Sequence, residues 1–166
     1  MRKAALVAHV CMSVGWLGAV AVFLALAVSA LGSRDEVIVR AGYVAMDVAT
    51  RYVIVPLAIA ALATGLLSSL GTTWGLVRHW WVLIKLALIV VATAVLLAQL
   101  GPIGALADAV TGAGLAGEQW RRARVSLVVH SGGGLLVLFA ATVLAVYKPR
   151  GLTRYGHRRT ARGPRR

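Results

Sequence analysis

Four long apolar stretches that are nearly free of charged residues limit most strongly what this chain can fold into. No Asp, Glu, Lys or Arg occurs at residues 4–33, 52–77 or 125–147, and Lys85 is the one charged residue in 80–107. A helix crosses a bilayer with about 20 mostly apolar residues, and a bilayer offers no partner to unpaired backbone groups. The sequence therefore predicts an all-α polytopic membrane protein, an antiparallel bundle of four transmembrane helices with spans near 4–31, 40–70, 79–100 and 123–147.

These spans divide the chain into a transmembrane domain, residues 1–147, and a basic tail, residues 148–166. The tail contains eight Lys and Arg and no acid, so we expect it to be disordered or bound to anionic lipid. The chain carries a formal charge of +13. Because the basic residues flank apolar spans, we expect a membrane surface and not nucleic acid as the anionic partner.

The basic residues are unequally distributed between the two ends of the predicted bundle. Eleven of them lie on the side of the two termini and of Arg78, and five lie on the opposite side. The positive-inside rule then predicts that both termini are cytoplasmic. Between the third and fourth spans, the Gly- and Ala-rich segment 101–121 is apolar enough to lie on the outer membrane surface as a short helix.

Ionisable residues within the spans are the strongest pointers to function, because a charge in lipid is costly and usually faces a partner or a pathway. Position along the spans sorts them by depth. The sequence predicts an inner group of His9, His79 and Lys85. It also predicts an outer group, which contains Asp47, Arg51 and His130.

Two of these sets have simple structural interpretations. Asp47 and Arg51 are four residues apart, so they share a helix face and can form an ion pair. The pair either makes a charged helix end tolerable or orients His130. Lys85 either extends to the inner surface or takes part in a site.

His130 is followed at helical spacing by Gly133 and Gly134, which lie on its own face. A flat macrocycle such as haem could approach an imidazole closely over such a face, and haem iron is commonly held by His. The alternative is that the small residues only allow close helix packing. The second ligand is open: either His130 holds a haem b alone, or His9 pairs with His79.

His9 resembles His130 in its setting, with Met12 one turn further along as a soft ligand for copper or haem iron. Copper is the less favoured metal. The sequence contains no CxxC, HExxH, Walker A or EF-hand motif, and no recognisable nucleophile with its base, so we expect no hydrolytic enzyme.

The run from His9 to Gly18, with His followed by Trp16 and Gly18, resembles the first helix of copper-resistance D-type membrane proteins. Trp81–Leu88 resembles the Lys-Leu-containing third helix of that family. The whole chain more closely resembles small four-helix bacterial membrane proteins of unknown function, through Ser69–Trp81, His130–Gly134 and Tyr147–Gly151. The resemblance implies a four-helix protein of the bacterial cytoplasmic membrane with haem or copper handling.

Two classes of function follow. In the first, the protein is a haem- or metal-binding module that uses His130, His9 or His79, with Gly133 and Gly134 making room. In the second, it is a non-catalytic accessory membrane protein, as an oligomer or beside another membrane subunit, whose polar residues only hold the bundle together. The residues leave both open.

Overall fold

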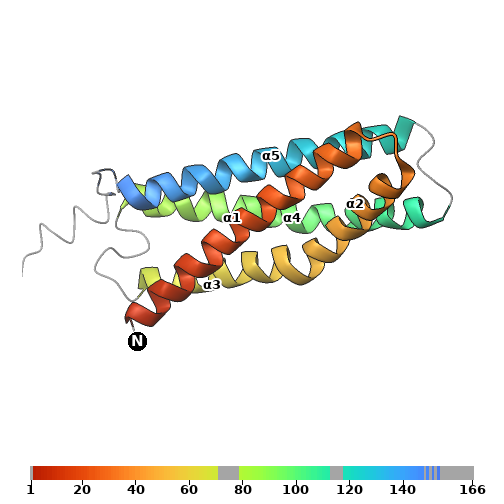
Figure 1. The fold of residues 1–166 in the computed structure, drawn as a ribbon. Coiled ribbons are helices and arrows are strands. Elements are labelled where there is room, and N and C mark those ends of the chain that lie inside the picture. The colour runs from red at the N-terminus through yellow and green to blue at the C-terminus, as the bar shows by residue number, and fades with distance from the viewer. Residues whose placement is uncertain are drawn as a thin grey trace, which may run out of the picture.

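The computed structural model describes residues 2–70, 79–112 and 118–147, together with residues 149, 151 and 153. These residues form an all-α four-helix bundle (Figure 1). Its elements are α1 (Arg2–Gly32), α2 (Glu36–Ala49), the π-helical turn η1 (Thr50–Ile54), α3 (Val55–Leu70), α4 (Trp80–Thr111) and α5 (Glu118–Tyr147). Because α2, η1 and α3 follow one another without a break, they make up the second of the four long rods.

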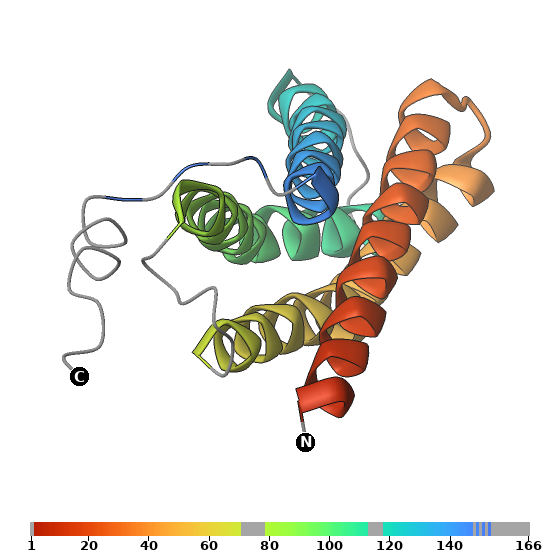
Figure 2. The ribbon, with the colours of Figure 1, turned by 90° about the vertical axis from the view of Figure 1, so that its left-hand side faces the viewer.

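Each rod is long and apolar enough to cross a membrane, as the sequence predicts. Figure 2 views the bundle from the end at which α1 begins, α3 ends, α4 begins and α5 ends. We call this the first end of the bundle and the other the second end. α1 packs against α2, α3 and α5, and α4 packs against α5 and α2. The first residue of α1 and the last of α5 thus share one end.

The second rod is wound more widely at η1, just before Pro56. The Val55 N–H donates to the Thr50 carbonyl, five residues back, and Pro56 has no N–H to continue the ladder. The hydroxyl of Thr50 is fully buried and donates to the Met46 carbonyl at 2.7 Å. The wide turn therefore lies directly before the proline that interrupts the helical ladder.

The third rod differs from its predicted extent. The sequence predicts an end at 100 and a separate surface helix over 101–121, whereas α4 continues through Pro102 to Thr111. Ile103, Leu106 and Val110 are buried in the core. Packing of α4 against α2 and α5 at the second end of the bundle therefore outweighs the local cost of a proline in the helix.

The core is densest toward the second end of the bundle. Trp16, Phe23, Tyr43, Met46 and Leu127 are all buried there or near the middle. Much of each rod nevertheless keeps its apolar side chains on the outer surface, as expected where lipid replaces water as the solvent. The predicted basic tail, apart from its three described residues, lies outside the described residues, as does the turn around Arg78.

Candidate functional site

Three helices meet at His9, near the first end of the bundle. Its Nδ1 lies 3.1 Å from the carbonyl oxygen of Ala61 and 3.2 Å from the Thr64 hydroxyl, both on α3. Its Nε2 lies 3.4 Å from Nζ of Lys85 on α4. The structure thus brings together His9 and Lys85, two members of the predicted inner group that are 76 residues apart in the chain.

These contacts fix the tautomer of the imidazole. A carbonyl oxygen can only accept a hydrogen bond, so Nδ1 carries the hydrogen and donates it to Ala61. Nε2 is then the nitrogen with a lone pair, and it accepts from the Lys85 ammonium. Metal-binding histidines are oriented in the same way, with the non-ligating N–H given to a backbone carbonyl.

A glycine makes this position of the imidazole possible. A Cβ atom at Gly65 would lie 2.9 Å from Cε1 of His9, closer than real contacts allow. Any side chain at this position would therefore push the ring away from Ala61 and Lys85. Neither Thr64 nor Gly65 could be identified from the sequence, because both meet His9 from across more than fifty residues.

Two buried polar groups lie on the helices that build this site. The Trp16 indole N–H on α1 and the Ser68 hydroxyl on α3 are buried without a hydrogen-bond partner among the described residues. Ser68 is one turn after Thr64, whereas Trp16 is seven residues after His9, about 10 Å further along α1. Buried polar groups are normally satisfied, so the region has unused hydrogen-bonding capacity.

Two other residues predicted for the inner site lie apart from this contact. His79 precedes the first turn of α4, and its ring centroid is 6.5 Å from that of Trp81. It is six residues before Lys85, about 9 Å along the helix. Met12 is half-buried and packs against the hydrophobic core. Among the described residues, no three His, Cys, Asp or Glu side chains form a group that could hold a metal ion.

The outer group divides between two places. Arg51 Nε donates to both carboxylate oxygens of Asp47, at 2.8 and 3.0 Å, and so forms the ion pair that the spacing predicts. The guanidinium lies against α4, where a Cβ at Gly104 would be 2.7 Å from Nη2 of Arg51. Gly104 therefore leaves room for the pair, which contacts α4 and does not orient His130.

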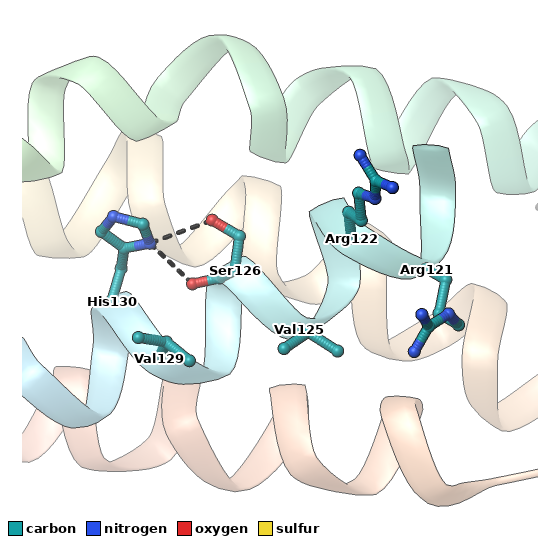
Figure 3. A pocket seen from close by; sticks show the side chains of 6 residues that line it. All are labelled: Arg121, Arg122, Val125, Ser126, Val129 and His130. Carbon is teal, nitrogen blue, oxygen red and sulfur yellow. Dashed lines mark hydrogen bonds between the residues drawn. The ribbon is translucent and has the colours of Figure 1, made fainter. Parts of the chain in front are cut away.

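His130 lies exposed on α5 and bonds to its own helix. Its Nδ1 donates to the Ser126 carbonyl at 2.7 Å, and the Ser126 hydroxyl is 3.0 Å away (Figure 3). A Cβ at Gly133 or Gly134 would meet nothing within 4 Å. The glycines therefore do not serve helix packing within this chain, and the structure brings none of the other candidate ligands to His130.

Arg124 is a polar residue of the second end whose contacts the sequence does not predict. Its Nε donates to the Tyr43 hydroxyl at 2.9 Å, and Nη2 donates to the carbonyls of Ala30 and Leu31 at 2.7 and 3.3 Å. It thus joins α5 to α2 and to the last turn of α1. A basic residue at a predicted span end was the only available signal.

Comparisons of the chain with protein-family models, with curated proteins and with solved structures give no match.

Proposed function

We propose that this protein is a haem b-binding membrane protein in which His9 and Lys85 hold the iron. The observation that supports this most directly is the approach of two nitrogen donors, His9 Nε2 and Lys85 Nζ, to 3.4 Å from different helices. His is a common ligand of haem iron, and the Lys85 amine would be the second nitrogen donor. The two side chains are in contact in this structure, so they would have to move apart to admit a porphyrin.

The number of donors favours haem over a bare copper ion. Protein sites for copper combine several imidazole, thiolate or thioether ligands. At this site the described residues offer two nitrogens, those of His9 and Lys85, while the nearby Met12 packs against the hydrophobic core. A porphyrin supplies four nitrogens of its own, so its iron needs only one or two from the protein. Bound haem would supply one-electron chemistry, tuned by its axial ligands and their hydrogen bonds.

The surrounding residues would prepare these two donors. The Ala61 carbonyl and the Thr64 hydroxyl hold the Nδ1 side of the ring, which keeps the Nε2 lone pair directed toward Lys85. Lys85 would bind as the neutral amine, so binding would release its proton. The Ser68 hydroxyl, which has no hydrogen-bond partner among the described residues, would supply a hydrogen bond to a polar part of a cofactor.

His130 supports a haem site less well. Its ring also has Nδ1–H bonded to a carbonyl, but it presents a single donor on the outer surface of α5. Because His9 combines the same tautomer with a second donor and partial burial, we place the site there.

The alternative function is that of an accessory membrane protein without a cofactor. It is supported by two contacts that need no cofactor. His9 and Lys85 are within hydrogen-bond distance of each other, and Asp47 and Arg51 form an ion pair. In that case the contacts of His9 would only hold α1, α3 and α4 together.

We also propose the cytoplasmic membrane of a bacterium as the location, with both termini cytoplasmic and the basic tail on anionic lipid. The support is the excess of basic residues on the side of the termini.

Absorption spectra of the purified protein, with and without reductant, test the cofactor. The protein should be made in cells supplied with haem. The native protein should show the spectrum of haem b, His9→Ala should lose it, and Lys85→Gln should change the band positions. His130→Ala is the matched control and should keep the native spectrum.

Three results would contradict this assignment. Loss of haem in His130→Ala with retention in His9→Ala would move the site to α5. A native spectrum in Lys85→Gln would remove Lys85 as a ligand. A colourless native protein whose His9→Ala variant is only less stable would leave the accessory function.

A further inference from the structure

An open hollow of about 520 Å³ lies along the first half of α5, at the second end of the bundle. Six side chains line it in two parallel rows on one helix face (Figure 3). One row contains Arg122, Ser126 and His130, and the other contains Arg121, Val125 and Val129. Members of a row are one helical turn apart, so each row runs down the helix from an arginine toward the interior of the span.

The chemistry of the hollow changes along the helix. Arg121 and Arg122 are exposed at the edge of the hollow nearest the second end of the bundle, and Val125 and Val129 follow one and two turns further into the span. Val129 is 63% exposed even though it lies within an apolar span. About 12 Å along the helix separates the arginines from Val129 and His130. A ligand that is anionic at one end and apolar at the other would match both parts of the hollow.

The two rows continue into Gly133 and Gly134, and a Cβ at either position would meet nothing within 4 Å. The surface beyond the hollow is therefore smooth and uncovered for another turn. Leu136 then follows on the same outward face and is 71% exposed. Such a path has room for a hydrocarbon chain lying along the helix.

We propose that this hollow binds an anionic phospholipid, with its phosphate on Arg121 and Arg122 and one acyl chain over Val125, Val129 and the glycines. Arginine suits this role because its planar fork of N–H groups matches the geometry of phosphate oxygens. The valines give the acyl chain a branched surface to pack on, and the glycines let it approach the backbone. This site is separate from the basic tail and from the His9–Lys85 contact, so it does not depend on the proposed haem.

Native mass spectrometry of protein taken from bilayers of phosphatidylglycerol and phosphatidylcholine tests the site. We expect the native chain to retain one phosphatidylglycerol, with about tenfold preference over phosphatidylcholine. Arg121→Gln with Arg122→Gln should lower its occupancy about tenfold. The matched control is Arg34→Gln with Arg40→Gln, which removes two exposed arginines from the same end of the bundle and should change nothing.

Gly133→Leu tests the acyl path separately, because it fills the smooth surface without changing the charge. It should also lower the retention of phosphatidylglycerol, at an unchanged helix content by circular dichroism. Equal retention by the two double arginine variants would overturn the proposal, and so would equal occupancy by phosphatidylcholine. A dimer that buries this face of α5 and excludes lipid from it would likewise overturn the proposal in favour of a second copy of the chain.

Discussion

At the scale of single residues, the Asp47–Arg51 pair shows how a charge is tolerated within a span. The carboxylate is the less exposed partner, at 21% of its side chain against 49% for the arginine. One guanidinium nitrogen contacts both of its oxygens. Half-exposed pairs contribute little to stability, but removal of one partner leaves a lone charge in lipid.

A double-mutant cycle on this pair should therefore give a modest coupling. We expect Asp47→Asn to lower the free energy of unfolding more in the native background than in the Arg51→Gln background. The coupling energy should be about 0.5–2 kcal/mol, because helices unfolded within lipid also find partners. Unfolding in detergent by denaturant measures all four variants. Strictly additive losses would show that the two side chains act independently.

Substitution by alanine should have opposite effects on stability at two glycines of the bundle. Gly18 on α1 has nothing within 4 Å of an added Cβ, whereas at Gly65 the added atom meets the His9 ring at 2.9 Å. Gly18→Ala should stabilise the helix by roughly 0.5–1 kcal/mol, and Gly65→Ala should destabilise the bundle because the ring is held on two sides. Thermal unfolding of both variants checks this order. Equal stabilisation by the two changes would mean that the imidazole moves freely.

At the scale of helices, Arg124 ties three elements together at the second end of the bundle. The last carbonyls of a helix have no partner within it, and in α1 those of Ala30 and Leu31 receive the Arg124 guanidinium. Tyr43, only 1% exposed, accepts from the same side chain. The arginine thus caps α1 and satisfies a buried phenol at once.

Loss of Arg124 should consequently weaken the contacts of α1, α2 and α5. Arg124→Gln should lower the free energy of unfolding by roughly 1.5–3 kcal/mol, as expected for hydrogen bonds from a charged donor. Tyr43→Phe should cost less, about 1 kcal/mol. The control Arg40→Gln removes an exposed arginine of α2 and should change little. If Arg124→Gln unfolds like this control, the cap contributes nothing to stability.

At the scale of the whole molecule, four rods that are each long enough to cross a membrane put both ends of the helical part at the first end of the bundle. A reporter fused after Arg166 should be cytoplasmic, and one inserted at residues 113–117, between α4 and α5, should be external. Reporters that require a cytoplasmic or an external environment for activity measure each fusion. An external carboxyl-terminal reporter would reverse the proposed orientation and move the basic tail to the outer surface.

The four rods and the ion pair could be predicted because their signals are local: long runs without charge, and two opposite charges four residues apart. The rotation of each rod about its own axis could not be predicted in this way. A helix that is apolar on every side carries no periodic signal of which face packs. For this reason the sequence does not predict that His130 faces outward on α5. It also does not predict that His9 contacts Ala61 and Thr64.

The end of α4 could not be predicted for a related reason. Pro102 is a strong local stop signal, and the residues after it are small and moderately apolar. What extends the helix to Thr111 is burial of Ile103, Leu106 and Val110 against segments far away in the chain. Tertiary packing here overrides a local preference, which a reading of neighbouring residues cannot anticipate.

The cap supplied by Arg124 also has a consequence for the order of events during synthesis. The carbonyls of Ala30 and Leu31 emerge from the ribosome more than ninety residues before the arginine that binds them. Until the fourth rod is delivered, these two carbonyls and the Tyr43 hydroxyl therefore lack the arginine that they contact in the finished bundle. The bundle is therefore complete only after its last helix has been made.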